Sequence, residues 1–446
     1  MVIGAGGREH SLALALARDP AVVAVHVAPG NQGTRALSAE RGWTPDEATA
    51  QAMAGLNPLD GRAVVDLARR LGANLVVIGP EAPLVAGVAD QVRRAGLACF
   101  GPSAAAAQLE GSKQYAKQVM AAAGVPTARS HYCRRPGDVD QALDDFGPPY
   151  VVKDDGLAGG KGVVVTDDWA AAMAHAAQCQ AVVVEEYLDG PEVSLFAICD
   201  GTTALPLLAA QDFKRVGDGD LGANTGGMGA YCPLPWAPAD LVEVTMARVI
   251  RPVLAELAAR GTPFIGLLYA GLALTSDGLR VVEFNVRFGD PETEVILPLL
   301  ASPLGQVLYA AATGRLGQAA WAVPATADDS DALKPDLAWH DGAAVVVIAA
   351  AEGYPAKPRA GGSLTWPTPP SAVEVVHCGT ALNDAGELVA AGGRVLGVVG
   401  RGSDLAAARQ AAYGFVDGVD FPSGFYRRDI AERAVAGQIA APAALG

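Results

Sequence analysis

The sequence contains few cysteines, few histidines and no long apolar run. Its six cysteines include no C-x-x-C pair, and its six histidines include no H-x-x-x-H pair. A zinc site or a disulfide framework is therefore not expected, and free thiols favour a reducing, cytoplasmic environment. No apolar run approaches the roughly 20 residues of a membrane-spanning helix, and the N-terminus lacks the pattern of a signal peptide.

Positive charge is also scarce. The chain has 33 Lys and Arg residues against 48 Asp and Glu residues, which gives a net charge of −15. Such a chain repels nucleic acids and anionic membranes over most of its surface. The composition therefore indicates a small-molecule enzyme without a nucleic-acid or membrane partner. Any phosphate must be bound by a few lysines, glycine-rich turns and metal ions. The sequence does not indicate an oligomeric state.

The first part of the chain predicts an α/β domain. A chain of 446 residues is expected to form two to four domains. Strands that alternate with helical segments predict a parallel sheet. The predicted strands are Val2-Ile3, Val22–Val27, Leu75–Ile78 and Leu97–Phe100, and the predicted helices are Glu9–Ala17 and Leu84–Ala95. Two apolar residues are few for a first strand. This leaves open either a short strand or a natural start upstream of Met1.

The pattern changes after Gly111. Ser112 is a predicted helix cap, and the long helix Ala239–Ala259 is expected to bend at Pro252. Further strands are predicted at Tyr150–Lys153, Gly162–Val165, Ala181–Glu186, Glu192–Cys199, Ala204–Ala210, Leu267–Leu274 and Leu279–Phe284. The Asp-rich segment Thr326–Lys334 is a predicted linker. Beyond it, the predicted elements of a small α+β domain are strands Ala343–Ala349, Ala372–Val376 and Arg394–Val399 and the helix Leu405–Val416.

Three glycine turns follow predicted strands of the first sheet. They are Gly4–Arg8, Pro29–Thr34 and Gly79–Glu81. The first turn fails the dinucleotide fingerprint, because Glu9 stands where the third glycine belongs. Each turn alone can be explained as an ordinary connection between a strand and the next helix. Together they would meet at the carboxyl edge of one sheet, which favours a phosphate site at helix N-termini.

The segment Lys153–Gly162 carries the strongest local signal. It fails the P-loop pattern, since Gly162 replaces the hydroxyl residue. Nevertheless, Lys153 and Lys161 flank a glycine loop between two strands, and such a loop can close over a triphosphate. A plain hairpin turn would not need a lysine in a buried strand.

Two strand ends carry carboxylates. In the first, Val182–Glu192, a backbone hinge could contact adenine, and a carboxylate one turn later could accept both ribose hydroxyls. It is a weak signal, because a solvated turn explains it better. The second, Val281–Glu292, is stronger. Glu283, Asn285 and Arg287 would share one face of a strand. Two oxygen ligands beside a guanidinium suit Mg²⁺ and an anionic substrate, and burying them without partners would be costly.

In chain order, the strings G-x-G-G-R-E-H, A-P-G-N-x-G-T, G-P-E-A-P-L, Q-L-E-G-S-K, K-x-D-G-L-A-x-G-K-G, N-T-G-G-M-G-A-Y and E-F-N-x-R-F-G-D-P-E-T resemble the glycinamide ribonucleotide synthetase family of ATP-grasp ligases. The closing R-x-D-I-x-x-R-A fits too. The resemblance implies an N-terminal α/β domain (1–111), an ATP-grasp region (112–325, with a lid at about 125–187) and a C-terminal α+β domain (326–446). It also implies ATP-dependent ligation of glycine to 5-phosphoribosylamine through glycyl phosphate, in purine biosynthesis.

The resemblance also implies roles for individual residues. The implied catalytic residues are Lys153, Arg287, Asp212 and Lys214. The implied ATP-binding residues are Lys113, Lys153, Gly159, Gly160, Lys161, Glu185, Glu186, Tyr187 and Glu192. The implied substrate-binding residues are Gly6, Gly7, Arg8, Gly30, Asn31, Pro80, Glu81, Asn224, Thr225, Gly226, Gly227, Arg287 and Asp290. Glu283 and Asn285 would bind Mg²⁺ or Mn²⁺.

The sequence departs from the family pattern in two places. The family usually carries alanine where Asp154 and Gly159 stand. A glycine-rich stretch that normally precedes the strand at Val182 is absent, which leaves open a shortened lid or an omitted loop. Another ATP-grasp ligase or carboxylase, or an ATP-binding regulatory protein, are the alternatives. Intact Glu283, Asn285 and Arg287 weigh against the regulatory protein.

Overall fold

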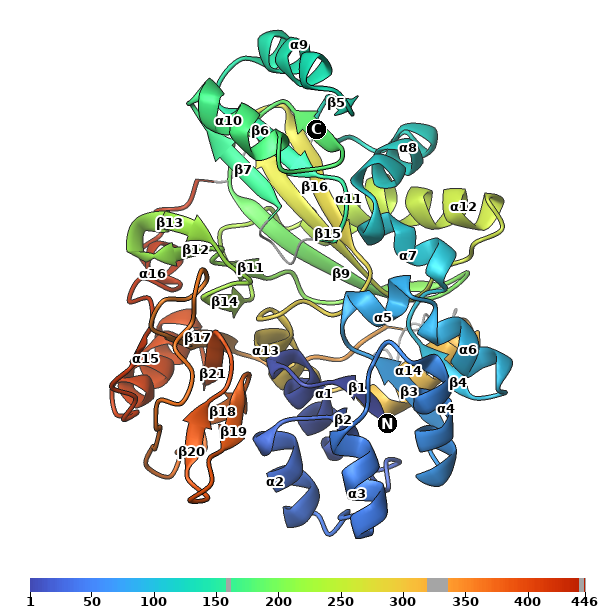
Figure 1. Cartoon of the computed structure of the whole chain (residues 1–446), viewed down its shortest axis with the longest axis vertical. Helices are drawn as coiled ribbons and strands as arrows, with labels where there is room; N and C mark the ends of the chain where they lie inside the picture. Colours follow the sequence, from blue (N-terminus) through green and yellow to red (C-terminus); the bar gives the residue numbers. More distant parts are fainter. Residues whose placement is uncertain (158–161, 319–335, 441–444, 446) are drawn as a thin grey trace, which may run out of the picture.

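The structure is a computed structural model that describes residues 1–157, 162–318, 336–440 and 445. In Figure 1 the N-terminal part (blue) and the C-terminal part (orange to red) lie below a central antiparallel sheet, and a smaller sheet lies above it. The predicted linker Thr326–Lys334 lies outside the described residues.

The N-terminal part forms the predicted parallel sheet. Its strands follow the order β2-β1-β3-β4. The strands are β1 (Val2–Gly4), β2 (Val27–Pro29), β3 (Leu75–Ile78) and β4 (Ala98–Phe100). The helices are α1 (Gly7–Arg18), α2 (Gln32–Glu40), α3 (Glu47–Ala54), α4 (Gly61–Arg70), α5 (Glu81–Val85), α6 (Val88–Arg94) and α7 (Ala104–Gly111). The three glycine turns therefore follow neighbouring strands, β1, β2 and β3, at one edge of the sheet.

Two predictions in this part are wrong in detail. The strand predicted at Val22–Val27 begins only at Val27, because its partner β1 has three residues and pairs Val2 with Val27. The single helix predicted at Leu84–Ala95 is two helices, α5 and α6. Gly87 separates them with a φ of +81°, a conformation that favours glycine.

The central sheet contains the strands that were predicted between Glu192 and Phe284. Its order is β10-β9-β15-β16, and all pairs are antiparallel. The strands are β9 (Glu192–Asp200), β10 (Ala204–Pro206), β15 (Ile265–Thr275) and β16 (Gly278–Asn285). The strand predicted at Ala204–Ala210 stops at Pro206, although Ala210 still forms an isolated bridge with Ser194.

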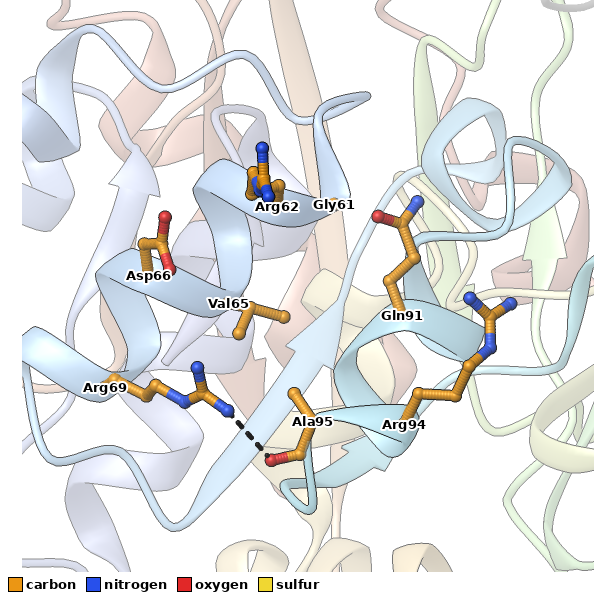
Figure 2. Close-up of a pocket in the computed structure, with 8 residues that line it drawn as sticks. All are labelled: Gly61, Arg62, Val65, Asp66, Arg69, Gln91, Arg94 and Ala95. Carbon is orange, nitrogen blue, oxygen red and sulfur yellow. Dashed lines mark hydrogen bonds between the residues drawn. The ribbon is translucent and has the colours of Figure 1, made fainter.

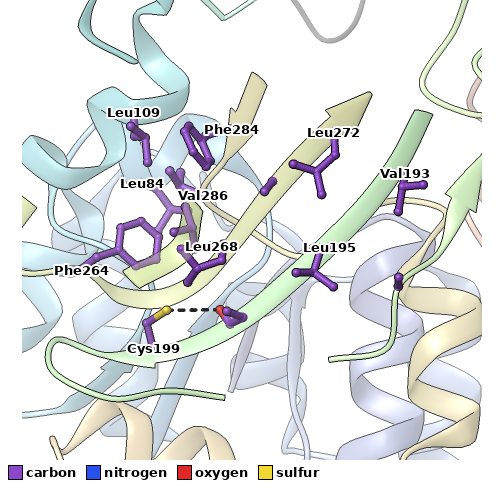
Figure 3. Packing of buried hydrophobic residues seen from close by; sticks show 14 of the residues in the cluster. Leu84, Leu109, Val193, Leu195, Cys199, Phe264, Leu268, Leu272, Phe284 and Val286 are labelled. Atoms are coloured by element: carbon purple, nitrogen blue, oxygen red, sulfur yellow. Dashed lines mark hydrogen bonds between the residues drawn. The ribbon is translucent and has the colours of Figure 1, made fainter. Parts of the chain in front are cut away.

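One face of this sheet is apolar and packs on helices. Figure 3 shows Leu195 of β9, Leu268 of β15 and Phe284 of β16 in one buried cluster with Leu84 and Leu109. Because side chains alternate along a strand, the neighbours of Phe284 on β16 point to the opposite face.

Helices flank the central sheet. The predicted break at Pro252 takes the form of a π-helical turn, Met246–Ile250, between α11 (Leu241–Thr245) and α12 (Arg251–Ala259). Proline has no N–H to donate, and a widened turn accommodates the lost bond. Ser112 caps α8 (Lys113–Ala123) as predicted, since its side chain accepts from the N–H of Tyr115.

A smaller sheet stands above the central one. Its order is β5-β8-β6-β7, and its pairs are antiparallel. The elements are β5 (Ser130–Cys133), β6 (Tyr150–Asp154), β7 (Val163–Thr166), β8 (Val182–Glu185), α9 (Pro136–Phe146) and α10 (Trp169–Ala176). Val152 and Val184 pack on α9 and α10. The alternating residues Lys153 and Glu185 therefore face away from these helices.

The C-terminal sheet includes strands from the middle of the chain. Its order is β11-β14-β17-β21-β18, and β22 pairs with β17. The strands are β11 (Gln211–Asp212), β14 (Gly229–Cys232), β17 (Ala343–Ala351), β18 (Val373–His377), β21 (Arg394–Gly402) and β22 (Gly424–Phe425). Helix α15 (Leu405–Val416) packs on this sheet.

The remaining elements are short. They are the hairpins β12 (Arg215–Gly217) with β13 (Leu221–Asn224) and β19 (Thr380–Leu382) with β20 (Leu388–Ala390), the helices α13 (Thr293–Ile296), α14 (Leu304–Ala312) and α16 (Glu432–Val435), and the 3₁₀ turns Asp218–Asp220, Leu297–Leu299 and Leu316–Gln318. Within the described ranges, no helix has the length and apolar character that crossing a bilayer requires.

Candidate active site

The predicted site residues gather around one cavity of about 1120 Å³. It is bounded by the small sheet, the central sheet, the hairpin β12–β13 and the turns of the N-terminal sheet. The predicted residues that line it are Arg8, Pro80, Glu81, Lys113, Lys153, Glu185, Glu186, Tyr187, Glu192, Asp212, Lys214, Asn224, Thr225, Gly226, Glu283, Asn285, Arg287 and Asp290.

A second hollow, of about 320 Å³, lies on the surface between α4 and α6 (Figure 2). Arg62, Arg69 and Arg94 surround it together with neutral residues and one carboxylate, Asp66. Arg69 donates to the carbonyl oxygen of Ala95. This hollow contains none of the predicted site residues, so the larger cavity is the candidate active site.

Two lysines enter the cavity from different elements. Lys153 of β6 is 4% exposed, and its Nζ lies 2.7 Å from Oε2 of Glu185 and 3.1 Å from the carbonyl oxygen of Val282. Burial opposes its charge, but Glu185 and Glu283 outweigh burial and raise the pKa of Lys153. Lys113 donates to the carbonyl oxygen of Gly156, 3.0 Å away. The raised pKa keeps Lys153 charged at neutral pH, and both lysines are placed to bind an anion in the cavity.

The glycine loop begins beside Lys113. Asp155 Oδ1 accepts from the Ser112 hydroxyl and from the N–H of Gln114, which ties the start of the loop to the N-terminus of α8. The predicted ATP-binding residues Gly159, Gly160 and Lys161 lie outside the described residues.

The strand β8 ends in the predicted hinge. Glu185 is buried, whereas Tyr187 is 53% exposed at the rim of the cavity. The Glu186 N–H donates to the carbonyl oxygen of Arg129, and the Glu186 carboxylate pairs with the Arg129 side chain at 2.5 Å. Glu192, at the start of β9, pairs with Lys214 at 2.5 Å. The hinge backbone and two carboxylates therefore line one side of the cavity.

Glu283 and Asn285 form the predicted metal pair. Both lie on β16, opposite Gly271 and Tyr269 of β15, and both line the cavity. Burial opposes the charge of Glu283, but Lys214, Lys153, Lys113 and Arg287 outweigh it and lower its pKa. A carboxylate and an amide oxygen side by side fit a hard divalent cation that arrives with a nucleotide. Within the described residues, no group of three His, Cys, Asp or Glu side chains is arranged as a metal site. A cation bound by Glu283 and Asn285 would therefore take its other ligands from substrate and water.

Asp212 and Lys214 also line the cavity. Asp212 ends β11, and burial, Glu292 and Glu192 raise its pKa to about 7 against the opposing effect of Lys214. For Lys214, Glu192 and Asp212 outweigh burial and raise the pKa well above its usual range. The Thr225 N–H donates to the Lys214 carbonyl oxygen at 2.8 Å, which links this pair to the predicted substrate loop.

Arg287 was predicted to lie on the same strand as Glu283 and Asn285. This prediction is wrong, because β16 ends at Asn285. Its Nη2 still lies 3.2 Å from Asn285 Oδ1, so the predicted proximity is retained. Ion pairs with Glu81 at 3.3 Å and Glu110 at 3.2 Å hold the guanidinium. Arg287 thus connects the strand β16 to the N-terminal turns.

The glycine turns divide into two groups. Arg8, Pro80 and Glu81 line the cavity, whereas Gly6, Gly7, Gly30, Asn31 and Gly227 do not. The Gly6 N–H already donates to the Glu9 carboxylate at 2.6 Å, and Glu9 also pairs with Arg8. The first turn therefore holds an internal carboxylate where an external phosphate was predicted.

Asn31 is likewise occupied. Its amide donates to the carbonyl oxygens of Ala5 and Gly6 at 2.9 and 3.3 Å, and to that of His377 at 2.7 Å. The side chain therefore joins the N-terminal turns to β18 of the C-terminal sheet.

Sequence reasoning missed several cavity residues, four of which are charged side chains close to the predicted ones. These four are Glu110, Lys117, Glu292 and Arg394. Lys117 lies 2.9 Å from Oε1 of Glu185, and Glu292 accepts from the Tyr269 hydroxyl at 2.6 Å. Glu110 and Lys117 lie close to Lys113 in the sequence, and this short spacing could have identified them as site residues. Arg394 has no such signal, because it lies far along the chain in the C-terminal sheet.

The motif R-x-D-I-x-x-R-A, which begins at Arg427, holds the hairpin β12–β13 in place. Arg427 is 1% exposed. Its guanidinium pairs with Asp220 at 2.8 Å and with Asp429 at 2.6 Å, and it donates to the carbonyl oxygen of Arg215. Because Arg215, Asp220 and Asn224 line the cavity, this buried arginine fixes one wall of the site.

The arrangement of a small antiparallel sheet over a larger one, with lysines, a carboxylate and an amide oxygen between them, defines an ATP-grasp protein. The biotin carboxylase domain of 2-oxoglutarate carboxylase from Hydrogenobacter thermophilus has the same fold, with a TM-score of 0.67 and 15% identity over 95% of this chain and 91% of that one. This likeness concerns the fold alone.

Family models identify the particular group. The phosphoribosylglycinamide synthetase N domain matches residues 1–110, its ATP-grasp (A) domain matches 111–293 and its C domain matches 344–433. The chain belongs to the phosphoribosylglycinamide synthetase family, whose members are ATP-dependent carbon–nitrogen ligases that use a divalent metal.

Individual relatives agree. The chain is 54% identical over 440 residues to phosphoribosylamine–glycine ligase of Streptomyces coelicolor, covering 97% of this chain and 99% of that one. It is 51% identical over 448 residues to the ligase of Mycobacterium bovis, covering 98% and 99%. The crystal structure of phosphoribosylamine–glycine ligase from Thermotoga maritima has a TM-score of 0.75 and 32% identity, covering 96% of this chain and 99% of that one.

Proposed function

We propose that the chain joins glycine to 5-phosphoribosylamine and converts ATP to ADP and phosphate, as the names of its relatives indicate for them. One observation carries the proposal beyond family membership. A single cavity contains Lys113 and Lys153, two lysines suited to binding phosphate. Asp212, Lys214 and Arg287, from other parts of the chain, line the same cavity. The cavity is large enough for a nucleotide and small substrates to react without leaving it.

The reaction follows from the chemistry of a carboxylate, which is a poor electrophile. In the first step the glycine carboxylate attacks the γ-phosphorus of ATP, which forms glycyl phosphate and releases ADP. In the second step the amine of phosphoribosylamine attacks the acyl carbon, loses a proton and expels phosphate. Positive groups around the cavity stabilise the transferring phosphoryl group, and positioning supplies much of the remaining catalysis.

The described residues divide these tasks. Lys153 and Lys113 bind the phosphates, the hinge at Glu185–Tyr187 frames the adenine, and Glu192 accepts from the ribose. Glu283 and Asn285 hold Mg²⁺ or Mn²⁺, which neutralises phosphate charge when it is bound.

The two small substrates occupy the other end of the cavity. Asp212, Lys214 and the loop Asn224–Gly226 receive glycine and the acyl phosphate. Arg8, Pro80, Glu81, Arg287 and Asp290 face phosphoribosylamine. Gly6 and Asn31 contribute by shaping this end of the cavity, because Glu9 and the backbone already occupy the Gly6 N–H and the Asn31 side-chain amide.

A coupled assay of ADP release tests this function. Release is expected only when glycine, phosphoribosylamine, ATP and a divalent metal are all present, and glycinamide ribonucleotide is the expected product by mass spectrometry. Parallel reactions with bicarbonate, formate or other amino acids serve as controls. Equal turnover with bicarbonate in place of glycine would assign the chain to another ATP-grasp activity.

The proposal also implies a reducing, cytoplasmic setting. All six cysteines are free thiols, and four of them are buried in cores where oxidation would disturb packing.

A further inference from the structure

Arg394 extends from the first residue of β21 into the cavity. Its Nη1 donates to the carbonyl oxygens of Gly226 at 2.6 Å and Asp290 at 2.8 Å, and its Nη2 lies 3.0 Å from Asp290 Oδ1. The guanidinium is 18% exposed and the Asp290 carboxylate 14%. The two hydrogen bonds to carbonyl oxygens are charge-assisted and stronger than bonds between neutral groups, and the ion pair with Asp290 is largely shielded from water.

The turn that Arg394 holds has little freedom of its own. Gly227 has a φ of +108°, and a Cβ atom there would lie 2.4 Å from Pro291 Cδ. A Cβ atom on Gly226 would lie 3.1 Å from Cζ of Arg394. The Gly226 N–H donates to the Tyr354 hydroxyl at 3.0 Å. Two side chains of the C-terminal part thus hold both backbone polar groups of one residue, the N–H and the C=O of Gly226.

We propose that Arg394 is a positioning residue that holds the Gly226–Gly227 turn against Asp290 and so shapes the glycine end of the cavity. This inference rests on the proposed function. Thr225, the residue before the turn, donates through its N–H and its hydroxyl to the carbonyl oxygen of Lys214. A displaced turn would therefore displace Lys214, which pairs with Glu192 at 2.5 Å.

The position of Arg394 also predicts which substrate is affected. The adenine hinge belongs to β8 of the small sheet, on other elements than the turn. Among the residues assigned to ATP, Glu192 is linked to the turn through its pair with Lys214. Loss of the Arg394 contacts should therefore weaken the use of glycine more strongly than the binding of ATP. Lysine cannot replace the arginine here, because one ammonium cannot reproduce a planar fork that contacts Gly226 and both polar groups of Asp290.

The test compares R394K with wild type in steady-state assays. We expect the KM for glycine to rise about tenfold or more, in line with the loss of one charge-assisted hydrogen bond. The ATP dissociation constant, measured by calorimetry, should stay within about twofold by the same reasoning. The matched control is R401K on the same strand, whose exposed guanidinium donates to the carbonyl oxygen of Ser371. It should behave as wild type.

A wild-type glycine KM in R394K, or an equal loss for glycine and ATP, would overturn the inference. If R394K does not fold, Y354F removes only the hydroxyl that accepts from Gly226 and should raise the glycine KM in the same direction. Hydrogen exchange of residues 221–230 without substrates provides a separate measurement, and faster exchange at Gly226 is expected in R394K. If wild type shows no glycine-dependent ADP release, the proposed function fails, while the exchange result still decides whether Arg394 positions the turn.

Discussion

The Glu185 carboxylate lies between two lysines: Oε2 is 2.7 Å from Lys153 Nζ, and Oε1 is 2.9 Å from Lys117 Nζ. None of the three side chains is more than 13% exposed. The carboxylate therefore keeps one cationic partner when the other lysine is removed or binds a phosphate instead. A substitution of Lys153 is therefore expected to weaken ATP binding without unfolding the protein.

The first prediction follows from this sharing. K153A should lower kcat/KM for ATP at least about 100-fold, as the loss of one preorganised charged donor does elsewhere. It should leave a folded protein, because Lys117 still pairs with Glu185. Initial rates against ATP concentration and a thermal melt measure both effects. K357A, at an exposed lysine of the C-terminal part, is the control. A near wild-type kcat/KM for ATP in K153A would remove Lys153 from the phosphate site.

The second prediction concerns the metal. E283Q keeps the shape of the side chain but removes a negative charge that faces Lys214, Lys153 and Lys113. We expect a large fall in kcat, partly restored by raised Mg²⁺ or by Mn²⁺, with little change in melting temperature. Rates across a metal titration test this. E352Q, at a side chain that is 68% exposed, is the control. Coinciding titration curves for E283Q and wild type would show that Glu283 is not a metal ligand.

The third prediction concerns pH. Burial raises the pKa of Asp212 to about 7, so the side chain is mostly neutral at pH 6 and mostly a carboxylate at pH 8. A carboxylate can bind the glycine ammonium, whereas the neutral acid cannot attract it by charge. The kcat/KM for glycine should therefore rise with pH through about 7. In D212N that rise should be absent and the activity low throughout. A pH profile of D212N that keeps the wild-type step would assign the titration to another group.

The fourth prediction concerns stability. Glu294 is fully buried, and neither carboxylate oxygen has a hydrogen-bond partner among the described residues. Burial and then Asp290 raise its pKa well above the usual range, against the effect of Arg394. A raised acid pKa contributes stability at low pH, and this contribution is lost as pH rises above the value of the unfolded chain, about 4.5.

E294Q cannot ionise and should not show this loss. The melting temperature of E294Q relative to wild type should therefore increase from pH 4.5 to pH 8, by a few degrees in order of magnitude. Thermal melts at several pH values measure the difference. E374Q, on the outer part of the C-terminal sheet where Glu374 pairs with Arg18, is the control. A difference that does not change with pH would mean that Glu294 ionises as it does in the unfolded chain.

Local spacing predicted the parts of the site that single strands carry. Glu283 and Asn285 are two residues apart, so the alternation of a strand places them together without knowledge of the fold. Lys153 was found for a similar reason, as a charged residue in an apolar strand beside a glycine loop. The parallel sheet also followed from alternating patterns, although β2 and β4 are shorter than predicted.

Long-range contacts could not be predicted in this way. Arg394 follows Asp290 by 104 residues, and only the completed C-terminal sheet brings the two together. The turn at Gly6 illustrates the opposite error. Its glycines match a phosphate-binding pattern, but the carboxylate of Glu9, three residues later, accepts from the Gly6 N–H. A pattern of backbone donors does not reveal which acceptor the folded chain supplies.

The C-terminal sheet contains a restriction on how the chain can be divided. Its strand β17 hydrogen-bonds to β14 from the middle of the chain, and β14 in turn pairs with β11, which carries Asp212. A chimera that exchanges the segment after residue 336 with that of a relative would thus replace β17, which is separated by one strand from β11 and Asp212. The last quarter of the protein is therefore not a detachable module, and cuts for fragment expression or gene fusion belong outside this sheet.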